Sequence, residues 1–229
     1  MESPRPDALV ETIHVRPGGG IALWPEHIRR IRRSAQALGF APVSDDLQAQ
    51  VHAAAAAAAT AAAATEDSDI AWRLRLLYEP DGTVCLAASA LVPLADRPGV
   101  AWASAHLHTP NAGVLDSSQT LLRHKTTFRP WYAAATSWLA QQSDIFDLLF
   151  VNEAGALCEG SRTNVYVQID GQWLTPPVQA GCLPGTVRAR LLRQRLVRCA
   201  SLTPKDIQQA QALRLSNGVR GWFNVVLKD

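Results

Sequence analysis

Lysine is scarce in this 229-residue chain, and its scarcity draws attention to one position. Lys125, Lys205 and Lys228 are the only lysines among 22 basic residues, so arginine supplies most of the positive charge. Lys125 lies mid-chain, in the string LLRHKTTFRP (121–130). Lysine, unlike arginine, can lose its proton and attack a carbonyl as a free amine. Lys125 is therefore a candidate nucleophile, although a basic residue at a strand end is more often simply exposed.

Other absences argue against whole classes of protein. No apolar run is long enough to span a bilayer, and the polar N-terminal string MESPRPDALVE predicts no signal peptide. The net charge of +2 does not favour nucleic acid as a partner. The four cysteines show no metal-ligand spacing, so we interpret them as reduced thiols of a cytoplasmic protein; they are Cys85, Cys158, Cys182 and Cys199.

The first half of the sequence predicts a strand, two helices and a hairpin. Alternating apolar residues predict a strand over 8–15, and helical spacing predicts a helix over 24–40. The alanine-rich stretch 49–69 predicts a second helix, to which we assign no function. Two strands are expected within 70–92, around a Pro-Asp-Gly turn. The stretch 94–118 is expected to be a loop-rich connection.

The second half predicts four further blocks in chain order. They are a strand end followed by a helix (122–142), strands with turns (146–177), a helix (185–197) and a strand–turn–strand (212–227). This order predicts an α+β fold in two lobes rather than a regular βαβ series. We expect an N-terminal lobe over 1–102, an interdomain loop over 103–118 and a C-terminal lobe over 119–229.

The helix over 24–40 carries a basic row beside its apolar stripe. The stripe at helical spacing is Ile28, Ile31, Ala35 and Leu38. Arg29 and Arg33 point away from this stripe, whereas Arg30 lies on its flank in a row with His27 and Ser34. A basic helix of this kind could bind nucleic acid, but aromatic partners are missing. A solvated face is the better interpretation for every arginine except Arg30.

Three segments of the second half could bind charged groups. In CLPGTVRARLLRQRL (182–196) a Pro-Gly turn leads into an amphipathic helix, whose first amides, at Gly185, Thr186 and Val187, would suit a phosphate. The turn SNGVRG (216–221) could also hold an anion on its amides. Glu159, in CEGSRTNVYV, could be a fixed negative charge beside a ring nitrogen. The alternatives are a plain loop-to-helix junction, a hairpin turn and a solvated carboxylate.

The order of these segments resembles that of a known family. The strings Glu11-Thr12, HIRRIRRSA, HKTTFRPWY, EGSRTN, TPPVQAGCLPGTVR and SNGVRG resemble the class IV aminotransferases, which are fold-type IV pyridoxal-phosphate enzymes. The resemblance runs over roughly residues 8 to 226, and EGSRTN…TPP…GCLPG is its most specific part. Within the family, HKTT…R..Y, EGSRTN and the terminal RGW look most like the aminodeoxychorismate lyase branch.

The resemblance implies roles for individual residues around pyridoxal phosphate. Lys125 matches the family's Schiff-base lysine, Arg30 its phosphate-binding arginine, and Glu159 the carboxylate that pairs with the pyridine nitrogen. Leu183 is expected to pack on a face of the cofactor ring. Backbone amides in two turns are expected to bind the phosphate, namely those of Gly185, Thr186, Val187, Asn217, Gly218 and Val219. The family also implies a homodimer with the cofactor in the cleft between the lobes.

The resemblance leaves two reactions open. The lyase reaction releases pyruvate from 4-amino-4-deoxychorismate and yields 4-aminobenzoate for folate synthesis, and Arg162 and Arg220 are candidates to bind the substrate carboxylates. The alternative is an aminotransferase for D-amino or branched-chain amino acids. Pro130 stands where branched-chain members carry a tyrosine, which favours the lyase. Gly218 and Val187 also depart from the hydroxyl residues that many relatives carry. Rivals of another class are a cofactor-binding protein without turnover and a nucleic-acid binder.

Overall fold

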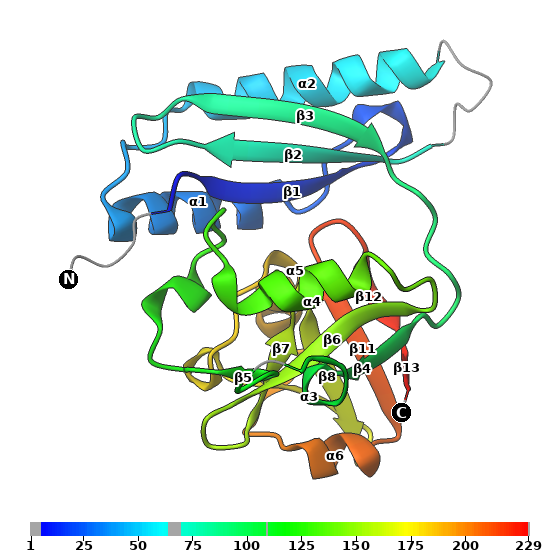
Figure 1. The fold of residues 1–229 in the computed structure, drawn as a ribbon. Helices are drawn as coiled ribbons and strands as arrows, with labels where there is room; N and C mark the ends of the chain where they lie inside the picture. The colour runs from blue at the N-terminus through cyan, green and yellow to red at the C-terminus, as the bar shows by residue number, and fades with distance from the viewer. Residues whose placement is uncertain (1–5, 64–69, 109, 229) are drawn as a thin grey trace. The chain divides into compact units, whose positions relative to one another are not determined.

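The structure is a computed structural model that describes residues 6–63, 70–108 and 110–228 (Figure 1). The chain divides by its internal contacts into two compact units. The first unit comprises the chain up to Pro93 together with Lys125–Phe128, and the second comprises Leu94–His124 and the chain from Arg129 onward. Both units mix helices and strands, as predicted. This grouping differs from the lobes expected for residues 94–102 and 125–128, and the lobe boundaries stay a prediction.

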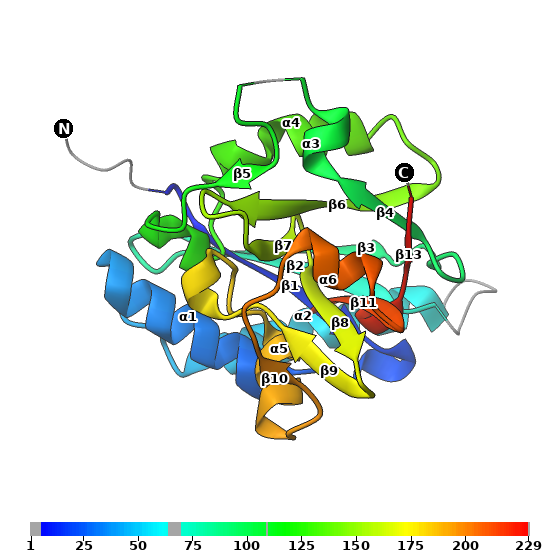
Figure 2. The same ribbon diagram turned by 90° about the horizontal axis from the view of Figure 1, so that it is seen from below.

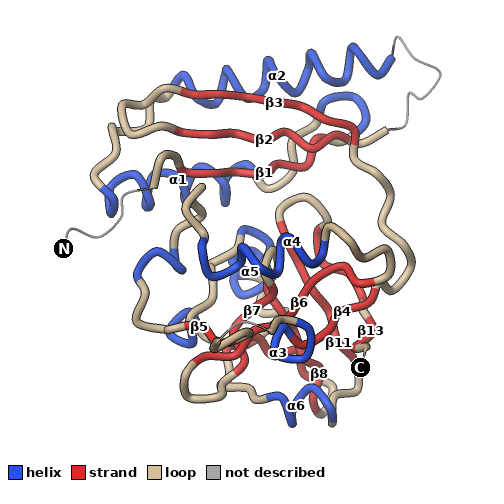
Figure 3. The backbone as a smooth tube through the Cα atoms, in the orientation of Figure 1, coloured by secondary structure: helices blue, strands red, loops and turns tan. Residues whose placement is uncertain are grey.

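The first unit is a three-stranded antiparallel sheet with two helices packed on one face. The strands are β1 (Leu9–Val15), β2 (Trp72–Tyr78) and β3 (Val84–Ala90), in the order β1-β2-β3. Figure 3 shows them with α1 (Trp24–Leu38) and α2 (Asp46–Ala63). The unit also contains the short 3-10 helix η1 (Pro17–Gly19). The odd-numbered residues of β1 share a face with the even-numbered residues of β2, and this face forms the core with both helices.

Helix α1 follows the sequence signals closely. Pro25 occupies its first turn, and Gly39 ends it in a left-handed conformation (φ 71°) with its N–H donating to Ala35 O. Ile31 and Ala35 are buried and Ile28 and Leu38 pack beside them, so the predicted stripe is confirmed. The row His27, Arg30 and Ser34 is buried as well, whereas Arg29, Arg32 and Arg33 are exposed.

Part of the alanine-rich stretch forms helix α2, where some of the alanines are buried by packing. Its buried residues, Leu47, Val51, Ala55 and Ala58, recur at helical spacing. Helix η1 approaches this face closely, because a Cβ on Gly19 would lie 3.6 Å from Ala55 O. Helix η1 therefore lies against the backbone of α2, and α2 begins earlier than predicted, at Asp46. The predicted extension over 64–69 lies outside the described residues.

Residues 125–128 are held by the first unit through backbone hydrogen bonds. Val10 N donates to Lys125 O (2.8 Å), and Thr127 N donates to Ala8 O (3.0 Å). Leu9 and Thr126 form an isolated antiparallel bridge. The expected strand end at Lys125 is thus a short stretch that pairs with β1 but belongs to no named strand.

The second unit contains two sheets. One has the order β13-β4-β6-β5 with β7 paired to β6, and the other has the order β10-β9-β8-β11-β12. The strands of the first are β4 (Gly99–Trp102), β5 (Val114–Leu115), β6 (Ile145–Asn152), β7 (Leu157–Gly160) and β13 (Val226–Leu227). Those of the second are β8 (Asn164–Ile169), β9 (Gln172–Thr175), β10 (Arg198–Cys199), β11 (Ala212–Asn217) and β12 (Gly221–Asn224).

Strand β6 lies between two cores of this unit. Leu148 and Phe150 face one core, and Leu149 faces the other. The first core is covered by α3 (Ala103–His106) and α4 (Ala133–Leu139), and Figures 1 and 2 both show α4 alongside β6. The second core joins β6 to the sheet of β8 and β11 and to α6 (Pro204–Gln208).

The remaining helices of this unit are short. They are η2 (Thr120–Arg123), η3 (Pro130–Tyr132), η4 (Val178–Ala180) and α5 (Thr186–Arg193). Helix α5 begins at the predicted Pro-Gly junction but ends four residues before the predicted end at 197.

The stretch 94–118, predicted to be a loop-rich connection, also contains regular elements that the sequence did not predict. This stretch contains β4, α3 and β5, and β4 pairs in parallel with β6. Four-residue and two-residue strands show too little alternation to be recognised, and they form here because β6 offers both edges for pairing. Of the described helices, none is both long and apolar enough to cross a membrane.

We expect Ala55→Leu to destabilise the protein by about 1–3 kcal/mol, because Ala55 is fully buried in the core of the first unit and a larger side chain would overpack it. The matched variant Ala57→Leu, at an exposed position of the same helix, should change stability by less than about 0.5 kcal/mol. Urea unfolding of both variants measures the difference. Equal stabilities would show that α2 is not packed at Ala55.

Candidate functional site

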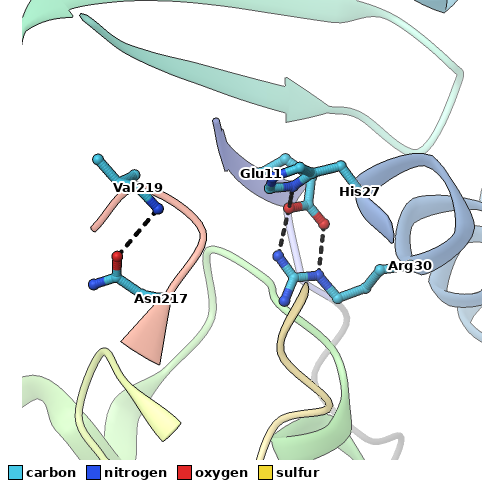
Figure 4. Close-up of polar contacts among 5 residues, drawn as sticks. All are labelled: Glu11, His27, Arg30, Asn217 and Val219. Atoms are coloured by element: carbon cyan, nitrogen blue, oxygen red, sulfur yellow. Dashed lines mark hydrogen bonds and ion pairs between the residues drawn. The ribbon is translucent and has the colours of Figure 1, made fainter. Parts of the chain in front are cut away.

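The first unit contains a buried cluster of three charged or titratable side chains, Glu11, His27 and Arg30 (Figure 4). Arg30 Nε donates to Glu11 Oε1 at 2.7 Å, and Arg30 Nη2 donates to Glu11 Oε2. His27 Nδ1 lies 2.6 Å from the same Oε2. Burial alone would raise the pKa of Glu11, but the charges of Arg30 and His27 lower it to about 2. Glu11 is therefore an anion at any physiological pH.

Lys125 belongs to the same unit as Arg30. Its backbone carbonyl accepts from Val10 N, one residue before Glu11, and its side chain is half-buried. The next residue, Thr126, is buried, and its hydroxyl donates to Phe128 O at 2.9 Å. Strand β1 thus fixes the backbone at Lys125 and, through Glu11, the guanidinium of Arg30.

Glu159 lies in the second unit, on β7, and is 2% exposed. Tyr132 Oη donates to its Oε1 at 2.7 Å, while Leu183 N (2.8 Å) and Asn164 Nδ2 (3.3 Å) donate to its Oε2. Burial raises the pKa of Glu159 to about 7, against the lowering effect of the Arg129 charge and of these hydrogen bonds. The interpretation of Glu159 as a solvated carboxylate is excluded.

Asp147 organises the turn that follows Glu159. It is fully buried on β6 and accepts from Ser161 Oγ (2.5 Å), Thr163 Oγ1 (2.6 Å) and Arg162 N (3.2 Å). Gly160 lies against it so closely that any Cβ would overlap with Asp147 Oδ2. Burial raises the pKa of Asp147 although the hydroxyl donors oppose this. The residues of the string GSRT therefore fold around the buried carboxylate of Asp147.

Asn164 connects this turn to the segment before α5. Its Nδ2 donates to Leu183 O at 2.8 Å and also reaches Glu159, while Leu183 N donates to Glu159. The side chains of Asn164 and Glu159 thus bind the backbone carbonyl and the backbone amide of Leu183, respectively. A Cβ on Gly185 would overlap with Asn164 Oδ1, so glycine is required there. These contacts explain why EGSRTN and GCLPG occur together in one chain.

The start of α5 has features of an anion site. Thr186 is 2% exposed, and its Oγ1 has no hydrogen-bond partner among the described residues. The N-cap residue Gly185 provides no side-chain cap, and the first amides of a helix have no intrahelical acceptor. The amide of Gly185, however, donates to Leu183 O at 2.8 Å, which leaves the amides of Thr186 and Val187 as the stronger candidates.

In the second predicted turn, SNGVRG, some of the backbone amides already donate hydrogen bonds within the turn. Asn217 Oδ1 accepts from Val219 N (3.1 Å) and from Arg220 N (2.8 Å), and Figure 4 shows the first of these bonds. The hydroxyl of Ser216 is also engaged, at 2.7 Å from Tyr166 Oη. An anion bound at this turn would have to share these amides with Asn217. The roles of Asn217, Gly218 and Val219 stay predictions.

The two candidate substrate arginines differ in their surroundings. Arg162 lies over the Phe146 ring at 4.7 Å, and its Nε donates to Phe146 O at 2.9 Å. Arg220 is half-buried in the turn after Asn217. Arg162 therefore makes a local structural contact, and a substrate role for either arginine stays a prediction.

The structure groups the candidate residues in two sets, one in each unit. Lys125 and Arg30 share the first unit; Glu159, Leu183 and the two turns share the second. Sequence reasoning missed the residues that hold them, namely Glu11, His27, Tyr132, Asp147 and Asn164. Glu11, His27, Tyr132 and Asn164 stand inside the quoted motifs, which was a usable signal, whereas Asp147 stands in an apolar strand with none.

We expect the cofactor-free protein to lose stability as the pH rises from about 4.5 to 7, because folded Glu159 binds its proton more tightly than the unfolded chain does. Glu159→Gln should remove a decrease of about 2–3 kcal/mol over this range. Urea unfolding at pH 5 and pH 8 measures it, with the exposed Glu153→Gln as control. An unchanged pH dependence in Glu159→Gln would refute the raised pKa.

The chain is similar in sequence and fold to several known proteins. A proposed amino-acid aminotransferase from Mesorhizobium loti is 31% identical, with a TM-score of 0.80 over 96% of this chain and 99% of that chain. A proposed aminodeoxychorismate lyase of Schizosaccharomyces pombe is 25% identical over 201 residues, which are 87% of this chain and 78% of the relative. A hypothetical aminotransferase from Mycobacterium tuberculosis, in a PLP-bound form, is 21% identical, with a TM-score of 0.69 over 97% and 81% of the two chains.

These similarities confirm the predicted fold type and the predicted resemblance. The family model for amino-transferase class IV matches residues 8–227, nearly the whole chain. All four cysteines are free, which agrees with their interpretation as thiols. The chain belongs to the class IV aminotransferase family of pyridoxal-phosphate-dependent enzymes.

Proposed function

We propose that this chain is a pyridoxal-phosphate-dependent lyase that converts 4-amino-4-deoxychorismate into 4-aminobenzoate and pyruvate. The observation that carries the cofactor part is Glu159, a buried carboxylate held by hydrogen-bond donors and lacking an ion pair among the described residues. The lyase part is supported by the S. pombe relative over most of the chain and by Pro130, which stands in place of the tyrosine of branched-chain aminotransferases.

The donor set fits pyridoxal phosphate in three respects. A buried carboxylate with a pKa raised to about 7 gains stability from a cationic N–H, which a protonated pyridine nitrogen provides. The unpartnered hydroxyl of Thr186 at a helix start suits a phosphate oxygen. In the first unit, Arg30 offers a guanidinium of the kind that binds phosphate, and Lys125 offers an amine that can react with an aldehyde. When bound, the cofactor supplies a ring that accepts the electron pair left by removal of a proton beside the substrate amine.

In the proposed reaction, Lys125 and Glu159 have separate roles. Lys125 Nζ takes the proton from the substrate carbon that bears the amine, and holds it for return. The bond from the substrate ring to the enolpyruvyl oxygen breaks with its electron pair going to that oxygen, so enolpyruvate leaves and the remaining ring becomes aromatic. The proton held by Lys125 is then given to the methylene carbon of enolpyruvate, which yields pyruvate. Glu159 keeps the pyridine nitrogen protonated, and the donors Tyr132 and Leu183 keep Glu159 in place. The proposal includes a homodimer, a small-molecule amine as substrate, and a cytoplasmic location.

A second candidate is supported by a specific observation. The M. loti protein is named as an amino-acid aminotransferase, and its identity to this chain exceeds that of the S. pombe lyase. An aminotransferase for D-amino or branched-chain amino acids would use Lys125, Glu159 and Arg30 in the same positions. The two reactions therefore differ in their substrates rather than in these residues.

We expect borohydride to fix pyridoxal phosphate to Lys125 alone, because the other two lysines lie outside the family's motifs. Peptide mapping after reduction locates the label. The variant Lys125→Ala should keep its fold and lose the covalent label and the activity, with Lys205→Ala as the matched control. Label on Lys205 or Lys228 would refute the assignment of Lys125.

A lyase restores its cofactor in each turnover without a second substrate, whereas an aminotransferase needs a keto acid to do so. We therefore expect 4-amino-4-deoxychorismate alone to give many equivalents of pyruvate per chain, measured with a coupled lactate dehydrogenase assay. Glu159→Gln should slow this reaction by about three orders of magnitude or more, since a charge partner at a reacting centre is lost.

The parallel assay supplies D- or branched-chain amino acids with and without a keto acid. Little change in the cofactor spectrum is expected from the amino acid alone. Rapid conversion that a keto acid reverses, with no pyruvate from aminodeoxychorismate, would establish the aminotransferase and overturn the lyase.

A further inference from the structure

We propose that Glu11 and His27 are positioning residues for the cofactor phosphate, which act by holding the guanidinium of Arg30 in one orientation. The inference rests on the proposed function, because it assigns Arg30 to the phosphate of pyridoxal phosphate. It concerns two residues that do not themselves contact the phosphate, and every contact that supports it lies within the first unit.

The position of Glu11 has no explanation in the core itself. On β1 it stands between Leu9 and Ile13 on the face that packs against the helices, where an apolar residue would fit the pattern. It is 1% exposed, and a buried carboxylate is unfavourable unless donors surround it. Both of its oxygens are occupied, by Arg30 and by His27. The cluster is therefore a complete acceptor site built around one carboxylate.

The contacts of Arg30 leave part of its guanidinium available. Nε and Nη2 form a two-point contact with Glu11, the geometry that fixes a guanidinium plane. No partner of Nη1 is present among the described residues. Arg30 is 6% exposed, so this remaining edge is held in a largely dry environment, where a charge-assisted bond to an anion is strong. One edge is used for orientation and the other remains for a phosphate.

His27 provides a second contact that limits the movement of the Glu11 carboxylate. Its Nδ1 contacts the same Glu11 oxygen as Arg30 Nη2, so the carboxylate cannot rotate without losing one of the two bonds. His27 is fully buried, and its Nε2 has no partner among the described residues. Because Nδ1 is already committed to Glu11, the ring has one orientation. His27 thus contributes by fixing Glu11, and Glu11 by fixing Arg30.

The test compares two ligands that differ only in the phosphate. Cofactor-free protein is titrated with pyridoxal phosphate and with pyridoxal, and binding is followed by intrinsic fluorescence of the tryptophans. We expect Glu11→Gln to raise the Kd for pyridoxal phosphate at least about tenfold and the Kd for pyridoxal less than about threefold, because only the phosphate contact is disturbed. His27→Gln should show the same selectivity with a smaller effect.

A matched control measures the effect of general destabilisation. Tyr78→Phe removes the hydroxyl that donates to Ala41 O and Pro42 O at 3.0 Å in the same unit, and it should leave the ratio of the two Kd values unchanged. The variants Arg30→Ala and Glu11→Gln/Arg30→Ala complete the set. If Glu11 acts only through Arg30, the double variant should bind pyridoxal phosphate no more weakly than Arg30→Ala alone.

The outcomes separate the inference from the proposed function. A wild-type protein that binds neither ligand would overturn both. Tight binding of pyridoxal phosphate by the wild type, together with an unchanged ratio in Glu11→Gln and His27→Gln, would overturn the inference alone. Additive losses in the double variant would also overturn it, because Glu11 would then act independently of Arg30. If Glu11→Gln does not fold, His27→Gln and the double-variant comparison with His27→Gln/Arg30→Ala decide the question.

Discussion

A carboxylate remains inside a protein only where hydrogen-bond donors replace the water that it has lost, and three buried carboxylates organise this chain. Asp147 collects the hydroxyls and the amide of the turn after β7, and that turn places Glu159 and Asn164. Glu159 and Asn164 in turn hold both polar groups of Leu183, just before the start of α5. Much of the local geometry of the second unit therefore follows from the need to satisfy two buried carboxylates.

Glu11 and Glu159 are both almost fully buried, but their pKa values are shifted in opposite directions. Glu11 is surrounded by Arg30 and His27, and its pKa lies near 2. Glu159 accepts its hydrogen bonds from neutral donors, and burial raises its pKa to about 7 although the Arg129 charge opposes this. The charge of the first is paired with Arg30 inside the chain, whereas the second forms no ion pair among the described residues. The same residue type is therefore held as an anion in one place and holds its proton to about neutral pH in the other.

The sequence predicts the parts of the fold that carry local signals. Helix α1 has Pro25 at its start and Gly39 at its end, and β2 and β3 alternate around a marked turn. Strands β4 and β5 escape prediction because they are short and exist through pairing with β6. At the site, residue type and motif order indicate Lys125, Arg30 and Glu159. The supporting residue Asp147 is not indicated, since a buried aspartate in an apolar strand differs from an exposed one only through its distant donors.

The pairing of β1 with β2 has a consequence for how errors of folding would be expressed. Glu11 pairs with Leu76 and faces the core because β1 has one particular alignment. A slip by one residue would exchange the two faces, turning Glu11 to the opposite side and bringing Val10 and Thr12 inward. The same slip would displace the backbone bond between Val10 and Lys125. A misaligned molecule would thus lose the hydrogen-bond partner of Arg30 and the backbone support of Lys125 together. Under the proposed function, the capacity to retain the cofactor would then report on whether the first sheet had formed in register.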